Sequence, residues 1–257
     1  MPPAFRLEKW YLDCVTDGGE AWVGYAAVLG VGKLKVRAAS LLRCDAAGAV
    51  SQRNRLRGVP LPTVEGSTVR WGVPGLGFDG EWTGRAAGFE RELLDPGEVS
   101  WCCVQSASDV AVRIGGERLR GEGYVERLTL TLPPWRLPID ELRWGRAVAF
   151  GRSVVWLDWV GPKSMRLVYL DGRPAARPCV SDREVTAEGV RVKLDEQATL
   201  RAGSVEKTVF RRVPGVTRLL ARHRLALDET KWLSRASMEF GPSRSSGWAI
   251  HEVVRWG

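Results

Sequence analysis

The sequence predicts an all-β protein made of two antiparallel β-barrels or sandwiches in tandem, with little helix. Three observations predict this class. Short runs of aliphatic and aromatic residues recur along the chain, and most end at Gly, Pro, Asp or Ser. Several runs alternate apolar and polar residues with a period of two, most clearly Tyr124 to Leu132. Prolines at 133, 134 and 138 interrupt the pattern near the middle of the chain, and similar runs resume beyond them.

The first half begins with a predicted hairpin of residues 7–15 and 21–29, because Thr16-Asp17-Gly18-Gly19 between them favours a turn. A third strand is expected over residues 33–42, and the polar residues 44–57 are expected to form a loop. Short strands should follow at residues 68–72, 78–85, 88–94, 99–105 and 109–114.

The run from Tyr124 to Leu132 should close the first half. Its alternation places Tyr124, Glu126 and Leu128 on one face of the strand, so the Glu126 carboxylate shares an apolar face. If that carboxylate is buried, its pKa rises and it can hold a proton at neutral pH. The alternative is a solvated strand end or an ion pair with one of the many arginines.

The second half should open with a hairpin of residues 143–150 and 153–160, and a strand at 165–170 follows. We therefore expect domains at residues 1–134 and 135–257, with a ligand at the seam between them. Further strands are expected at residues 190–194, 198–202, 204–210, 236–240 and 248–256, and only residues 216–228 and 229–233 fit a helix as well as a strand.

Two short similarities suggest that the halves are repeats. Leu12-Asp13-Cys14-Val15 resembles Leu157-Asp158-Trp159-Val160 near the start of each half. Gly123-Tyr124-Val125-Glu126 and the segment 247–252 close the two halves. Both similarities favour duplication of one β-unit.

Composition limits the compartment and the partners. The 257 residues carry a formal charge of +8, and the arginines are scattered singly rather than clustered, so we expect no nucleic-acid partner. Five cysteines, two of them adjacent, favour free thiols. Neither a signal peptide nor an apolar run long enough to span a membrane is evident, which predicts a cytoplasmic protein. An apolar substrate could still bring it transiently to a membrane surface, and the sequence does not indicate an oligomeric state.

Several catalytic classes lack their motifs. Two histidines and no Cys-x-x-Cys argue against a zinc site, so no metal is expected. The serine-nucleophile and P-loop patterns do not occur. Gly75-x-Gly77-x-x-Gly80 matches the dinucleotide spacing, but it leads into a strand-like run instead of a helix and is read as a turn. We therefore expect chemistry without a cofactor.

Two motifs carry a family resemblance. Lys9-Trp10-Tyr11 in the first strand and Gly121-x-Gly123-Tyr124-x-Glu126 in the strand that closes the first half resemble the carotenoid 1,2-hydratase (hydroxyneurosporene synthase) and tocopherol cyclase superfamily, which includes lipocalin-like Diels-Alderases. In that pattern a Trp-Gly pair closely follows the glutamate. Here Trp144-Gly145 is displaced by the proline-containing insertion. The resemblance implies tandem lipocalin-like β-barrels with an apolar cavity at or near their interface.

The implied chemistry is protonation of an alkene by a buried acid, with aromatic faces that stabilise the cation. We name Glu126 and Asp158 as catalytic candidates, with Asp13 as the counterpart of Asp158 in the first half; an ion pair at a strand end is the alternative for Asp158. Twelve tryptophans supply many aromatic faces, although most should simply fill the core. The expected ligand-binding residues are Trp10, Tyr124, Trp144, Trp156 and His251.

Two functions remain open at this point. The first is a cofactor-independent enzyme, a hydratase or cyclase, that promotes hydration, cyclisation or a pericyclic reaction of an isoprenoid, polyene or polyketide-like substrate. The second is a non-catalytic carrier of a small hydrophobic ligand. They differ because the enzyme needs a buried ionisable group facing the ligand, whereas a carrier needs only an apolar wall.

Overall fold

A computed structural model describes residues 5–149, 151–204 and 227–257 of the chain. Within these residues the protein consists of two antiparallel β-sheets and two short 3-10 helices. The predicted all-β, antiparallel class with little helix is therefore confirmed. Neither of the helices in the described ranges is long and apolar enough to cross a membrane.

The chain forms two compact units, and each is described by itself. Most of the first sheet belongs to unit 1, and most of the second sheet belongs to unit 2. Unit 1 comprises Met1–Pro133, Phe150–Ser153 and Asp171–Arg173, and unit 2 comprises Pro134–Ala149, Val154–Leu170 and Pro174–Gly257.

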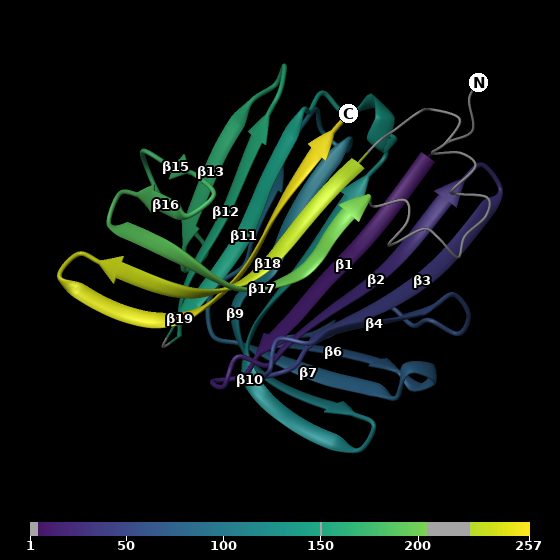
Figure 1. Ribbon diagram of the computed structural model, residues 1–257. Coiled ribbons are helices and arrows are strands. Elements are labelled where there is room, and N and C mark those ends of the chain that lie inside the picture. The colour runs from purple at the N-terminus through teal and green to yellow at the C-terminus, as the bar shows by residue number, and fades with distance from the viewer. Residues whose placement is uncertain (1–4, 150, 205–226) are drawn as a thin grey trace. The chain divides into compact units, whose positions relative to one another are not determined.

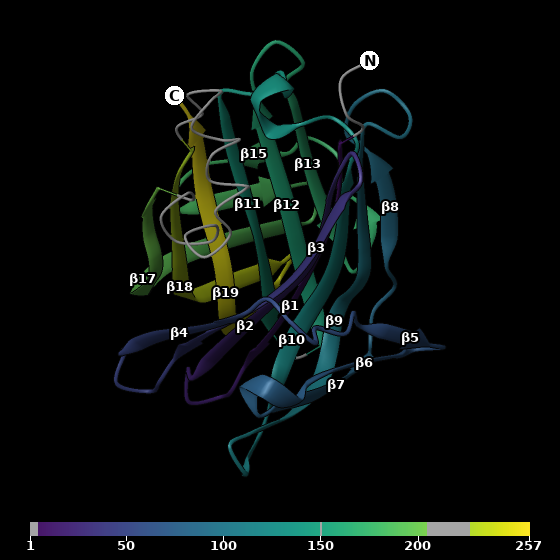
Figure 2. The same cartoon turned by 90° about the vertical axis from the view of Figure 1, so that its right-hand side faces the viewer.

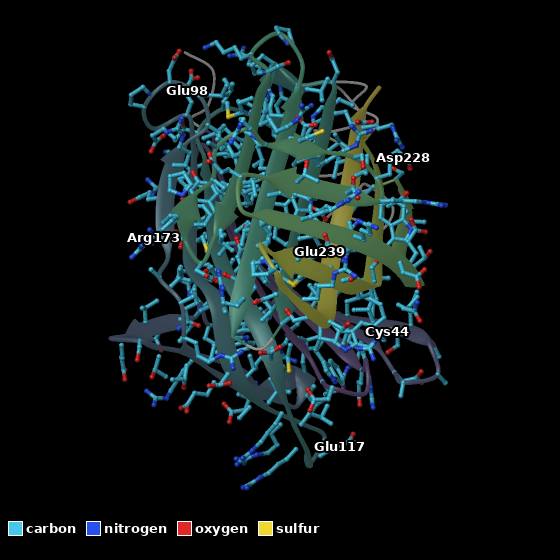
Figure 3. The ribbon with its side chains drawn as sticks, turned by 90° about the vertical axis from the view of Figure 1, so that its left-hand side faces the viewer. Cys44, Glu98, Glu117, Arg173, Asp228 and Glu239 are labelled. Carbon is cyan, nitrogen blue, oxygen red and sulfur yellow. The ribbon has the colours of Figure 1, made fainter. Side chains whose placement is uncertain are left out.

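The described part of the first sheet has ten strands, in the order β4-β3-β2-β1-β10-β9-β7-β6-β5 with β8 paired to β9 (Figure 1). The long β9 and β10 meet at the Gly115-Gly116 turn, and Glu117, labelled in Figure 3, begins β10. The bounds are β1 (Phe5–Val15), β2 (Ala21–Val31), β3 (Leu34–Cys44), β4 (Val50–Arg55), β5 (Thr63–Glu65), β6 (Thr68–Val73), η1 (Pro74–Leu76), β7 (Phe78–Gly84), β8 (Phe89–Glu92), β9 (Val99–Ile114) and β10 (Glu117–Leu130).

The second sheet follows the connector, which contains the short helix η2 (Pro134–Arg136). Its described strands run in the order β14-β13-β12-β11-β19-β18-β17-β16-β15, and β11, β12 and β13 lie side by side in Figure 2. The bounds are β11 (Glu141–Ala149), β12 (Arg152–Val160), β13 (Met165–Leu170), β14 (Arg173–Pro174), β15 (Cys179–Val180), β16 (Glu184–Ala187), β17 (Val190–Ser204), β18 (Leu227–Phe240) and β19 (Ser243–Trp256).

The two sheets share one strand order. In each sheet the first strand pairs with the last, β1 with β10 and β11 with β19, and the other strands extend outward on both sides. The similar segments Gly123–Glu126 and 247–252 therefore lie in equivalent strands, β10 and β19. The similarity between Leu12–Val15 and Leu157–Val160 does not, because the first segment lies in β1 and the second in β12, which is the second strand of its sheet. Asp13 is therefore not the topological counterpart of Asp158.

Each unit has its own apolar core, built by the period-two alternation of its strands. In unit 1 the core lies on the face that carries Trp10, Leu12 and Trp82. In unit 2 the core lies on the face that carries Val154, Trp156 and Met238. The opposite face of each sheet must therefore carry the alternate residues, and these include most of the buried charges.

Five local predictions differ from the structure or fall outside it. The two strands expected at 190–194 and 198–202 are the single strand β17. Residues 44–57 were expected to form a loop but contain the strand β4. β4 pairs with β3 at the edge of the sheet, where a strand can be polar, so its composition did not indicate a strand. The two strands expected at 99–105 and 109–114 are the single strand β9. Residues 229–233 lie in β18 and are not helical. Most of the segments 204–210 and 216–228 lies outside the described residues.

Candidate active site

The motif Gly121-x-Gly123-Tyr124-x-Glu126 brings β10 close to β1. A Cβ on Gly121 would collide with the carbonyl oxygen of Val15, and a Cβ on Gly123 would collide with the carbonyl oxygen of Asp13. Only glycine permits this approach, since it alone lacks the Cβ. The glycines thus set the distance between the two strands at the point where their polar side chains gather.

Four of these side chains form a compact group on the face opposite the core, which we call the Tyr–carboxyl block: Tyr11, Asp13, Tyr124 and Glu126. The register pairs Tyr11 with Glu126 and Leu12 with Val125, so Tyr124 lies opposite Asp13. The Tyr11 hydroxyl donates to Asp13 Oδ2 at 2.9 Å, and the Tyr124 hydroxyl donates to Glu126 Oε2 at 2.9 Å. The two phenol rings contact each other edge to face, with centroids 6.1 Å apart.

Glu126 is 8% exposed and sits among aromatic groups. The indole Nε1 of Trp101 on β9 donates to Glu126 Oε2 at 2.6 Å, so this oxygen accepts from both Trp101 and Tyr124. The Cys103 thiol is hydrogen-bonded to the Tyr124 hydroxyl. Burial, together with Cys103 and the negative charge of Glu126, raises the pKa of Tyr124 well above its ordinary value. Tyr124 therefore keeps its proton and acts as a hydrogen-bond donor.

Asp13 is fully buried, at 0% exposure. Its main-chain carbonyl accepts a hydrogen bond of 2.7 Å from the indole of Trp82, which fixes the strand from the core side. On the other side of β1, Val23 lies opposite Asp13 and Tyr25 lies opposite Tyr11. The ammonium of Lys9, one pleat along β1, lies 5.2 Å from the centroid of Tyr25. Because carboxylates are costly to bury, their concentration on this face points to chemistry rather than to stability.

An apolar strip lies on the same face beyond Lys9, and it is partly exposed. Leu7 lies opposite Leu29, and Leu29 lies opposite Val36. From Tyr11 to Phe5 the strip extends roughly 20 Å at the usual rise of a strand. We define the apolar strip as Phe5, Leu7, Leu29, Val31, Leu34 and Val36.

Trp10 lies on the other face of the same sheet. It belongs to the core, its indole donates to Glu8 Oε1 at 3.0 Å, and the Arg127 guanidinium lies 5.5 Å from its ring. The structure therefore places Trp10 and Tyr124 on opposite faces of the sheet in unit 1. The two residues were expected to bind the same ligand, and their side chains do not share a face.

In unit 2 the structure brings Trp156 and His251 together. Their ring centroids are 6.4 Å apart, and Trp232 stacks on the imidazole at 5.2 Å. Ser234 Oγ and His251 Nε2 are 2.8 Å apart. Gly145 makes room for the pair, because a Cβ there would collide with the Trp156 indole and with Cβ of His251.

The imidazole of His251 is 4% exposed. Burial, and to a smaller extent the positive charge of Lys231, lowers the pKa of His251 from 6.5 to about 4, although Asp182 acts in the opposite direction. The imidazole is therefore uncharged at neutral pH, where it can still form a hydrogen bond with the hydroxyl of Ser234.

The other two predicted residues of unit 2 are engaged in ionic contacts. Asp158 is buried and accepts from Arg166 Nη2 at 2.9 Å, which raises the pKa of Arg166. This ion pair is the alternative that the sequence left open for Asp158. Trp144 lies on the face opposite Trp156, with the Lys231 ammonium 5.3 Å from its ring. Lys231 is 1% exposed and pairs with Glu252 and Glu229.

The structure thus pairs Glu126 with Tyr124 in unit 1 and Trp156 with His251 in unit 2. The sequence interpretation gave Tyr11 no role, although Tyr11-x-Asp13 repeats the spacing of Tyr124-x-Glu126 and could have revealed it. Alternation in the predicted strand 99–105 marked Trp101 as a residue that could point inward, but Trp101 was not chosen as a ligand-binding residue. No cluster of three or more potential metal ligands occurs among the residues described.

Fold and site together define a class: a two-unit antiparallel β protein with a buried tyrosine–carboxyl group on the non-core face of its first sheet. No protein-family model and no curated protein sequence matches the chain.

Solved structures do resemble it. CghA with Sch210972 superposes with a TM-score of 0.61 and 14% identity over 98% of this chain and 88% of that one. A putative AttH protein from Nitrosomonas europaea superposes with a TM-score of 0.57 and 12% identity, over 97% of this chain and 92% of that one. Kievitone hydratase from Nectria haematococca superposes with a TM-score of 0.53 and 12% identity, over 97% of this chain and 88% of that one. At these identities the three structures show a shared fold, and the predicted tandem β architecture is confirmed at that level.

Proposed function

We propose that the protein is a cofactor-independent enzyme that binds an apolar isoprenoid, polyene or polyketide-like substrate and acts on it by proton transfer from Glu126. The observation that carries this proposal is that the Tyr–carboxyl block and the apolar strip share one face of unit 1, with Lys9 between them on β1. A substrate whose hydrocarbon chain lies on the strip would bring its unsaturated end to the block. A structural neighbour named as a hydratase supports the reaction class.

Glu126 suits proton transfer better than Asp158 does. Two donors to Glu126, the indole of Trp101 and the hydroxyl of Tyr124, are neutral groups that reach the same oxygen, Oε2. Asp158 instead faces the guanidinium of Arg166. The nearby indole and phenol rings would stabilise a cation formed on the substrate.

The apolar strip predicts where the ligand binds. Leu29→Glu should weaken binding of cis-parinaric acid, a fluorescent conjugated polyene, at least about tenfold, since it places a charge in the strip. Val64→Glu is the matched control, because Val64 is 48% exposed at the edge strand β5. Equal affinity in both variants would show that the ligand binds elsewhere.

A second experiment separates an enzyme from a carrier. The purified protein is extracted with organic solvent, and mass spectrometry identifies any apolar compound that copurifies. That compound is then incubated with the wild type and with Glu126→Gln. An enzyme converts it, and the variant binds it without converting it. Unchanged compound in the presence of the wild type would establish the carrier instead.

A further inference from the structure

The Tyr–carboxyl block contains two similar pairs, not one. Tyr11 with Asp13 on β1 and Tyr124 with Glu126 on β10 each join a phenol and a carboxyl group two residues apart, both at 2.9 Å. The register sets the pairs in opposite directions, so that each phenol faces the other strand's carboxyl group. The two carboxyl groups therefore occupy one diagonal of the block and the two phenols occupy the other.

The diagonal sets a useful spacing. The Cα atoms of diagonal neighbours on an antiparallel pair lie about 7–8 Å apart, so both carboxyl groups can approach one bound substrate. Enzymes that use one carboxyl group as acid and another as base also place the two so that a water molecule fits beside the reacting bond.

Resting on the function proposed above, we infer that Asp13 is a second catalytic carboxylate, the base that activates water, and that the reaction is addition of water to a carbon–carbon double bond or its reverse. Glu126 transfers its proton to one carbon, and the π electrons form the new C–H bond. The cation at the other carbon accepts the lone pair of a water molecule, which forms the C–O bond. Asp13 takes the proton that this oxygen releases.

The step balances without an oxidant or reductant. After it, Glu126 is ionised and Asp13 is protonated, and transfer of that proton back to Glu126 restores the starting state. The net change is one water molecule added to the substrate. Tyr11 is a positioning residue in this scheme, because its hydroxyl orients Asp13 without touching the substrate.

Infrared spectroscopy tests the assignment without any substrate. At neutral pH the wild type should show the carbonyl band of a protonated buried carboxyl group. The band should disappear in Glu126→Gln and remain in Asp13→Asn. The matched control is Glu81→Gln, whose carboxylate is exposed and paired with Arg70, and it should leave the band unchanged. A band that disappears in Asp13→Asn and remains in Glu126→Gln, or no band in the wild type, would overturn the assignment.

Isotope exchange tests the two roles separately, with all-trans-farnesol as the probe in D2O. Glu126→Gln should lose both deuterium incorporation at the alkene and water addition. Asp13→Asn should keep deuterium incorporation and lose water addition by about 100-fold or more. Tyr11→Phe should also keep deuterium incorporation and lower the rate of water addition, by a smaller factor than Asp13→Asn. A general loss of folding would reduce deuterium incorporation and water addition together. Loss of water addition alone is therefore specific to removal of a base.

The two proposals fail in different ways. If Asp13→Asn adds water at the wild-type rate while Glu126→Gln does not, Asp13 is not the base and the proposed function stands. If the wild type neither exchanges deuterium nor adds water, and the infrared band is absent, the proposed function fails and the role of Asp13 fails with it.

Discussion

The buried imidazole of His251 makes the stability of the protein depend on pH in a way that can be calculated. Its pKa falls from 6.5 in the unfolded chain to about 4 in the folded one, chiefly through burial and secondarily through Lys231. Below about pH 6.5 the imidazole of His251 therefore binds a proton in the unfolded chain but stays neutral in the folded protein until the pH approaches about 4. The resulting stability is complete above pH 6.5 and declines as the pH falls toward 4.

The size of the effect follows from the shift. Each pKa unit corresponds to about 1.4 kcal/mol, so His251 should account for a loss of about 3 kcal/mol in the free energy of unfolding over this range. Other carboxyl groups also titrate there, so the measurement must be a difference. The double variant His251→Phe/Ser234→Ala removes the imidazole and leaves no unpaired hydroxyl in its place.

The assay is urea unfolding followed by tryptophan fluorescence, at several pH values between about 7 and 4. The free energy of the wild type minus that of the double variant should decrease by about 3 kcal/mol as the pH falls. Titrations shared by both proteins cancel in this difference. A difference that stays constant, or that increases toward acid pH, would refute the reasoning, because it would mean that the folded protein accommodates the charged imidazole.

Three further outcomes are expected. Gly123→Ala should lower the free energy of unfolding by about 1–3 kcal/mol because its Cβ meets the β1 backbone, whereas Gly18→Ala, in an open turn, should change it by less than about 0.5 kcal/mol in the same urea assay. Lys231→Met should lower the free energy of unfolding by about 3–5 kcal/mol, because it removes the cation that pairs with Glu229 and Glu252. Arg70→Met, which removes two exposed ion pairs, should lower it by less than about 1 kcal/mol. Equal losses would contradict the buried network. With a thiol reagent on the native protein, exposed Cys179 should react first, half-buried Cys102 more slowly, and the buried Cys14, Cys44 and Cys103 only on unfolding. Rapid labelling of more than two thiols would show that the burial is wrong.

Much of the fold follows from period-two alternation. The alternation predicts strands such as β10 and β13 and the faces of Tyr124 and Glu126, because burial of one face of a sheet imposes that period. It fails for β4, whose residues are polar on both faces since it lies at an edge. It also divides β9 in two, because the Ser and Gln residues near its middle read as a break.

The candidate site was predictable only in part. The motif around Glu126 is local in sequence, so its glycines and its Tyr-x-Glu spacing could be read directly. The pairing of Asp13 with this motif could not, because it depends on the register between the first and the last strand of the unit. Likewise, nothing near His251 in the sequence indicates Ser234 or Trp232, which reach it across a strand pair.

The pairing of β1 with β10 has a consequence for folding on the ribosome. Leu7 must lie opposite Leu130, so the first sheet cannot form its central pair until nearly all of unit 1 has been synthesised. Closing so long a loop is entropically costly, and sheets dominated by such contacts fold slowly. Until then β1 and β2 expose an unpaired apolar edge, the kind of surface that invites aggregation. Synthesis of β10, and with it Glu126, therefore completes the first sheet and the candidate catalytic centre at the same moment.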